Sequence, residues 1–90
     1  MEERTSTITE AVVVSAPGCH FCEDVTRNLE SLADDHPIRI RLVDVSSEEG
    51  REIFRVHRPA RPPAVLLDGR YVGSGPLSRR KLRKLLEGTR

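Results

Sequence analysis

The sequence predicts an α/β domain built on a four-stranded mixed sheet with helices on both faces. Three observations lead to this prediction. The chain has 90 residues, enough for one hydrophobic core but not for two. Apolar residues make up 37% of the chain and gather in runs, as in a folded protein. These runs switch between strand-like and helix-like spacing in the order β-α-β-α-β-β-α, so we expect a single domain over residues 1–90, with flexible ends at 1–9 and 88–90.

The first half of the chain predicts a strand, a helix and a second strand. Residues 11–14 form a valine-rich run that ends at a Pro-Gly turn, which is typical of a buried strand leading into a loop. Residues 21–32 have apolar side chains at helical spacing, on one face of an amphipathic helix: Phe21, Val25, Leu29 and Leu32. Residues 38–45 first alternate and then become apolar, which predicts the second strand.

The next segment predicts a second helix. Ser46 and Glu49 have the spacing of a capping box, which places the start of this helix at Ser46. We expect its buried side to consist of Ile53, Phe54 and Val56. Prolines at positions 59, 62 and 63 then end the helix and stiffen the connection to the next strand.

The last third of the chain predicts a β-hairpin and a terminal helix. Residues 64–67 and 70–73 have the pattern of two strands, and the Asp68-Gly69 dipeptide between them favours a tight hairpin turn. The helix that follows has two possible starts. Ser78 could cap it, or Pro76 could occupy its first position.

Composition and charge exclude several classes of protein. No apolar run approaches the about 20 residues of a membrane-crossing helix. The polar first ten residues lack the features of a secretory signal, so we expect a cytoplasmic protein. The basic run 79–84 is interrupted by Leu82 at core spacing, and few aromatic residues are present for base stacking. We therefore expect a solvated helix face, no nucleic-acid or membrane partner, and a monomer.

Two cysteines stand three positions apart, at Cys19 and Cys22. In a cytoplasmic chain, such a pair indicates either redox chemistry or half of a zinc site. Three histidines could supply further ligands, but none stands at ligand spacing from another, so we expect no metal in the monomer. A metal site shared between two chains and an inert, reduced pair remain alternatives.

The position of the pair in the predicted helix assigns a role to each cysteine. Thiol–disulfide exchange needs a thiolate as the attacking group. Cys19 stands at the start of the helix, where unpaired N–H groups and the helix dipole favour negative charge. Cys22 lies one turn later and should be less exposed. We therefore predict two catalytic residues, with Cys19 as the nucleophile and Cys22 as the residue that resolves the mixed disulfide.

The ordered set of motifs resembles the thioredoxin-fold oxidoreductases, and most closely the short bacterial glutaredoxin-like proteins. A Cys-X-X-Cys pair follows the first strand, a proline precedes the third, and a hairpin, a Gly-rich stretch and a helix follow. Two segments carry the resemblance: Pro17-Gly18-Cys19-His20-Phe21-Cys22-Glu23-Asp24 and Pro63-Ala64-Val65-Leu66-Leu67-Asp68-Gly69-Arg70. It covers about residues 10–87.

The resemblance implies a thioredoxin-like fold and a thiol–disulfide oxidoreductase of cell redox homeostasis and electron transport. The substrates would be disulfides of proteins or small molecules, and a reductase or thiol donor would supply the electrons. No metal or organic cofactor is implied, because the disulfide itself is the redox group. The resemblance also implies that Pro63 follows a cis peptide bond and lies against the cysteine pair, with Pro62 beside it in the substrate site.

Two further side chains are candidates for the substrate site. His20, as an imidazolium, would stabilise a thiolate on Cys19, although an exposed spacer without effect is the alternative. Arg61 and Arg58 would attract an acidic partner if the proline loop lies near Cys19, and solvated loop arginines are an equally valid reading. Phe21 is expected to pack in the core, because it shares the apolar helix face.

Departures from the glutaredoxin pattern bear on the electron donor. Glutathione-using members carry a lysine where this chain has Ala16, and an acidic residue after the Gly-rich stretch, where residues 73–77 have none. They also have a Thr-Val pair where this chain has Arg61-Pro62. We therefore expect poor use of glutathione. The alternative function is a non-catalytic binding or adaptor module that keeps the fold.

Overall fold

The computed structural model describes residues 8–88. It contains seven elements in the predicted order: β1 (Thr9–Ser15), α2 (His20–Leu32), β2 (Ile38–Asp44), α3 (Glu48–His57), β3 (Ala64–Leu67), β4 (Arg70–Ser74) and α4 (Arg79–Gly88). Of the ends expected to be flexible, residues 1–7 and 89–90 lie outside the described residues, whereas Thr9 begins β1 and Gly88 ends α4. No helix within residues 8–88 has the length and apolar character needed to cross a membrane.

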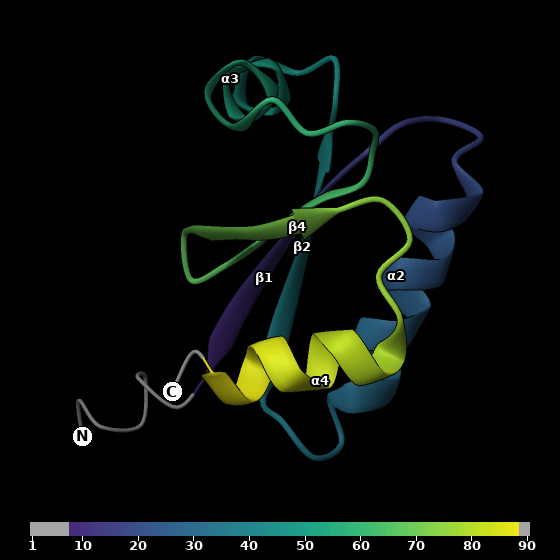
Figure 1. Cartoon of the computed structure of the whole chain (residues 1–90), viewed down its shortest axis with the longest axis vertical. Coiled ribbons are helices and arrows are strands. Elements are labelled where there is room, and N and C mark those ends of the chain that lie inside the picture. The colour runs from purple at the N-terminus through teal and green to yellow at the C-terminus, as the bar shows by residue number, and fades with distance from the viewer. Residues whose placement is uncertain (1–7, 89–90) are drawn as a thin grey trace.

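The four strands form one mixed sheet in the order β2-β1-β3-β4. Strands β1 and β2 are parallel, whereas β3 is antiparallel to both of its neighbours. Helices α2 and α4 cover one face of the sheet and α3 covers the other (Figure 1). The structure therefore confirms the predicted α/β class, the mixed sheet and the helices on both faces.

Two hydrophobic clusters, one on each face of the sheet, explain why the central strands lack polar alternation. In β1, Ala11 and Val13 face α2 and α4, whereas Val12 and Val14 face α3. All four side chains are at most 5% exposed. Successive side chains of a strand point to opposite faces, so a strand covered on both faces is apolar at every position. This is the physical basis of the runs in β1 and β3.

Side-chain caps and a tight turn set several element boundaries. Ser78 caps α4 by accepting a hydrogen bond from the backbone N–H of Lys81 at 3.1 Å, which decides against a start at Pro76. Between β3 and β4, Asp68 and Gly69 both have positive φ values, of 50° and 83°, as a type I′ hairpin turn requires. The predicted hairpin is thus confirmed in position and in turn chemistry.

The predicted start of α3 was wrong by one residue. The N-cap is Ser47, whose Oγ accepts the backbone N–H of Gly50 at 3.1 Å. Ser46 instead donates its hydroxyl to a carboxylate oxygen of Asp44 at 2.6 Å. Glu49 makes no capping box, because its carboxylate binds the guanidinium of Arg41 on β2.

The buried side of α3 also differs in part from the prediction. Ile53 and Phe54 pack against the α3-side cluster, but Val56 is 54% exposed. The helix approaches the end of β2 closely at Gly50, where an added Cβ would overlap the carbonyl oxygen of Asp44. The helix is therefore seated on the sheet through its first turn. Val56, two turns later, lies beyond the sheet contact.

Candidate redox site at the start of helix α2

The two cysteines lie where β1 leads into α2. A three-residue loop, 16–18, follows β1 and ends at Gly18, whose φ of 72° suits glycine. Cys19 then forms the N-cap of α2 with an extended backbone. Cys22 lies in the first turn, and its sulfur is joined to that of Cys19 in a disulfide. The pair is therefore present in its oxidised form.

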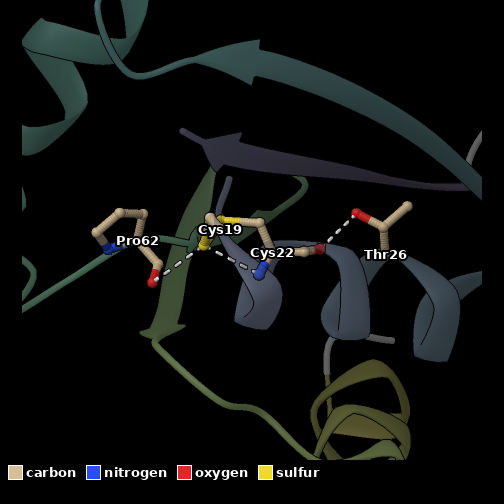
Figure 2. The surroundings of a disulfide bond; sticks show 4 residues. All are labelled: Cys19, Cys22, Thr26 and Pro62. Atoms are coloured by element: carbon tan, nitrogen blue, oxygen red, sulfur yellow. Dashed lines mark hydrogen bonds between the residues drawn. A yellow bond between two sulfur atoms is a disulfide. The ribbon is translucent and has the colours of Figure 1, made fainter. Parts of the chain in front are cut away.

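The two sulfurs differ in exposure and in partners. Cys22 is buried, with 4% of its surface exposed, whereas Cys19 is half-buried. The backbone N–H of Cys22 donates to Sγ of Cys19 at 3.1 Å, and the Thr26 hydroxyl donates to the Cys22 carbonyl at 2.9 Å (Figure 2). The sulfur of Cys19 thus replaces the oxygen that normally caps a helix N-terminus. An outside group reaches Cys19 more readily than Cys22.

The loop before β3 lies against the cysteine pair. The carbonyl oxygen of Pro62 is 3.9 Å from Sγ of Cys19, on the side of the disulfide away from Thr26 (Figure 2). The Pro62–Pro63 peptide bond is cis, and Pro63 is fully buried. The backbone N–H of Gly75 donates to the Pro63 carbonyl at 2.9 Å, which ties this loop to the one before α4. Segments remote in sequence therefore meet at Cys19.

An open hollow of about 500 Å³ lies on the Pro62 side of Cys19. It brings together four of the predicted site residues and two others, as its lining shows: Cys19, His20, Phe21, Ala60, Arg61 and Pro62. The fourth predicted substrate-site residue, Pro63, is fully buried and does not line the hollow. Sequence reasoning did not single out Ala60, and an alanine in a loop carries no signal of its own.

Phe21 does not pack in the core as expected. It belongs to neither hydrophobic cluster and is half-buried at the rim of the hollow. The guanidinium carbon of Arg61 lies 5.9 Å from the centroid of its ring, at cation–π distance. Phe21 lies on the same helix face as the core residues of α2. At the first turn, however, this face meets the proline loop and not the core.

A second hollow, of about 430 Å³, lies on the other side of the disulfide. It is lined by the loop after β1, both cysteines, one face of α2 and the exposed Leu42 of β2. The polar residues of α2 in it are Glu23, Thr26, Arg27 and Glu30. Sequence reasoning missed this hollow. The only available signal was the spacing of these four residues along one helix face, which solvated helix surfaces share.

Neither Arg58 nor His57, one of the histidines considered as metal ligands, adds to this site. Arg58 forms the left-handed C-cap of α3 and lines neither hollow. His57 stacks on Tyr71, with ring centroids 4.7 Å apart. Within residues 8–88, no group of three histidine, cysteine or acidic side chains is placed to hold a metal ion.

Comparisons with known proteins identify the fold. No family model matches the chain, and no curated protein matches it. Among solved structures, the thioredoxin of Fasciola hepatica is similar, with a TM-score of 0.67 over 99% of this chain and 90% of that chain. The chain has the thioredoxin fold. At 24% identity this likeness concerns the fold alone, so the glutaredoxin-like assignment stays a prediction.

Proposed function

We propose that this thioredoxin-fold protein is a thiol–disulfide oxidoreductase whose redox group is the Cys19–Cys22 pair. One observation carries the proposal. The disulfide joins an accessible sulfur at a helix N-terminus to a buried sulfur one turn later. This asymmetry separates an attacking residue from a resolving residue. The fold of the Fasciola thioredoxin supports the same reading at the level of architecture.

The proposed reaction begins with the reduced pair. The Cys19 thiolate attacks one sulfur of a substrate disulfide, forms a mixed disulfide and expels the other sulfur as a thiolate. Cys22 then loses its proton and attacks Sγ of Cys19, which releases the second substrate thiol. Two electrons pass to the substrate, and the protein is left with the Cys19–Cys22 disulfide. A thiol donor or a reductase returns the pair to the dithiol.

The surroundings of Cys19 favour its thiolate. The N–H of Cys22 already points at Sγ of Cys19, and the helix dipole adds positive potential at the same end. Both effects favour the thiolate over the thiol at this position, so we expect the reduced Cys19 to be the more reactive of the two thiols. Pro62 and Pro63 contribute shape, since they form the wall beside the reacting sulfur.

We infer that the electron donor is a dithiol or a protein rather than glutathione. Ala16 offers no cation at the second hollow, and the loop 73–77 supplies no acid for the ammonium group of glutathione. Arg61 provides one cation, but no acidic residue lines the hollow beside it. Charge-assisted hydrogen bonds contribute about 1.5–3 kcal/mol each, so losing two of them weakens binding by orders of magnitude.

The deciding experiment is a single turnover of the reduced protein with a neutral aromatic disulfide, dithiodipyridine. Wild type should release two equivalents of thiopyridone and end as the intramolecular disulfide. Cys22→Ser should release one equivalent and keep a pyridylthio group on Cys19, visible by mass spectrometry. Cys19→Ser should react slowly, because Cys22 is buried.

Two outcomes would contradict the proposal. If the wild-type protein reduces dithiodipyridine no faster than a free model thiol does, the non-catalytic adaptor function is favoured instead. Faster alkylation of Cys22 than of Cys19 by iodoacetamide would reverse the two roles. The choice of donor is tested separately, by comparing multiple turnovers supported by glutathione with those supported by dithiothreitol; efficient turnover with glutathione would refute that part alone.

A further inference from the structure

The hollow beside Cys19 has an uneven distribution of charge. Of its six lining residues, Arg61 is the one with a permanent charge, and none is acidic. The Arg61 side chain is exposed and makes no ion pair with any residue of the described chain. An unpaired guanidinium beside an apolar surface is a binding group for carboxylates, because its planar donors match the two carboxylate oxygens.

Arg61 is held on both sides by its neighbours. Its guanidinium lies over the ring of Phe21, at 5.9 Å from the centroid. Its aliphatic stem runs past Gly75, where a Cβ would lie 3.6 Å from Cγ and 3.7 Å from Cδ of Arg61. These contacts come from α2 and from the loop before α4. These contacts restrict the Arg61 side chain at the lining of the hollow, which lowers the conformational entropy lost when it binds a carboxylate there.

The opposite side of the disulfide has the opposite charge. Glu23 and Glu30 line the second hollow, and the one cation there, Arg27, is bonded to the Asp24 carboxylate at 3.4 Å. A negatively charged substrate that approaches Cys19 is thus repelled on one side and attracted on the other. This difference gives the substrate an orientation as well as an affinity.

We propose that the site selects disulfides that carry a carboxylate close to the sulfur attacked by Cys19, and that Arg61 is the specificity-determining residue. This inference rests on the proposed function and uses the same exchange steps. Cys19 attacks the substrate sulfur while the neighbouring carboxylate binds Arg61 and the apolar part of the substrate contacts Phe21 and Pro62. The carboxylate takes no part in the electron transfer.

The test compares two aromatic disulfides in single turnovers of the reduced protein. Dithiobis(nitrobenzoate) carries a carboxylate on each ring, and dithiodipyridine carries none. Arg61→Gln should lower the rate constant for the carboxylate substrate about tenfold, the worth of one charge-assisted contact, and leave the neutral substrate within about twofold of wild type. Arg61→Lys should restore part of the loss. Because each variant is compared with wild type on the same substrate, the differing intrinsic reactivities of the two disulfides cancel.

A matched control separates local from general charge effects. Arg80→Gln removes the same charge from the exposed face of α4, outside both hollows. It should leave both rate constants within about twofold of wild type, because Arg80 lines neither hollow and solvent screens its charge. The neutral disulfide provides a second control, because any effect of Arg61 on the ionisation of Cys19 alters both substrates together.

A second experiment, with peptide substrates, tells whether the site accepts carboxylates of proteins or only those of small molecules. Its substrates are the disulfide dimers of two short peptides, which place Glu or Gln next to their single cysteine. A preference for the Glu peptide that disappears in Arg61→Gln extends the proposal to protein substrates. A preference confined to the aromatic pair restricts it to small molecules.

The outcomes separate this inference from the proposed function. If dithiodipyridine is not reduced, the oxidoreductase proposal fails. If it is reduced, but Arg61→Gln slows both aromatic disulfides equally and the two peptides react alike, the specificity inference fails and the oxidoreductase stands. High salt should reduce the preference of wild type for the carboxylate-bearing disulfide and leave the ratio of the two rate constants unchanged in Arg61→Gln. That result would support the specificity inference.

Discussion

At the scale of single residues, Cys19 does two things with one atom. Its sulfur accepts the N–H of Cys22, so it caps α2, and it is also the sulfur open to an attacking or attacked group. Serine or aspartate would cap the helix as well or better, but neither could form the disulfide. The sulfur that caps the helix therefore lies in the positive potential of the helix N-terminus, which favours its negatively charged form.

His20 provides the first test at this scale. Its side chain is exposed at the first position of α2, next to Cys19. If its positive form stabilises the Cys19 thiolate, His20→Ala should raise the pKa of the Cys19 thiol modestly, since solvent screens the pair. A less stabilised thiolate also makes the dithiol a stronger reductant.

Thiolate absorbance against pH and the redox midpoint measure the two effects of His20. His57→Ala serves as a control, because His57 stacks on Tyr71 and lines neither hollow beside the cysteines. Superimposable titrations of wild type and His20→Ala would leave the helix terminus as the source of activation.

Residue spacing could predict that Cys19 and Cys22 lie close together, because within one helical turn the sequence separation fixes the distance. It could not predict the position of Phe21. Periodicity places a side chain on the apolar face of its helix, but the face extends beyond the sheet at the first turn, and only the neighbouring loop decides what covers it.

At the scale of the elements, the start of α3 shows how competing hydrogen bonds move a boundary. Ser46 and Ser47 are both good caps, and Glu49 favoured the first of them. Two long-range demands overrode this local pattern. The Asp44 carboxylate accepts the hydrogen bond of the Ser46 hydroxyl, and Arg41 of the neighbouring strand binds the Glu49 carboxylate. A sequence pattern records what a segment could do by itself, whereas these partners come from β2.

Substitution of the two serines should separate the true cap from the apparent one. Ser47→Ala should lower the free energy of unfolding by about 1 kcal/mol, because the Gly50 N–H loses its acceptor. Ser46→Ala should cost less than about 0.5 kcal/mol, since its backbone N–H still binds Asp44. Urea unfolding of both variants measures the difference. A larger loss for Ser46→Ala would refute this account of the α3 cap.

At the scale of the whole molecule, exposed carboxylates link β1, β2 and α3. Arg41 binds the Glu49 carboxylate through two hydrogen bonds, at 2.9 and 2.7 Å, and its Nε lies 3.6 Å from a carboxylate oxygen of Glu10. The hydrogen bond from Arg41 holds the pKa of Glu49 below its ordinary value, and the Ser46 hydroxyl does the same for the pKa of Asp44. Folding therefore favours the charged form of both groups.

The pH dependence of stability follows from the sign of these shifts. With folded pKa values below the unfolded ones, the unfolded chain binds more protons in acid. The stabilisation is complete above the unfolded values, near pH 4 to 4.5, and is lost as the pH falls through the lowered folded values. Melting temperatures should decline from about pH 5 downward.

Glu49→Gln should flatten the acid decline of the melting temperature, since it removes one of the shifted groups. Glu87→Gln is the matched control, because Glu87 is exposed on α4 and forms no ion pair within the described chain. Equal slopes for Glu49→Gln and wild type would show that the Arg41 pair contributes nothing to acid sensitivity.

The fold was more predictable than the site for a physical reason. Each strand and helix carries its own periodicity, and a parallel crossover with a following hairpin leaves few arrangements of four strands. The hollow beside Cys19 depends on where two loops and the end of a helix meet. Arg58 and Arg61 were equivalent in the sequence, and only the left-handed turn at Arg58 and the Phe21 contact distinguish them.

The meeting of Cys19 with Pro62 has a consequence for the newly made protein. The two residues are 43 positions apart in the chain. Ribosomes add about 5–20 residues per second, so roughly 2 to 9 s separate the synthesis of the two sides of the hollow. During that interval the nascent chain carries two thiols without the wall and the arginine that surround them later. We expect it to exchange with any nearby disulfide at the rate of an ordinary thiol, and to become selective only when β3 pairs with β1.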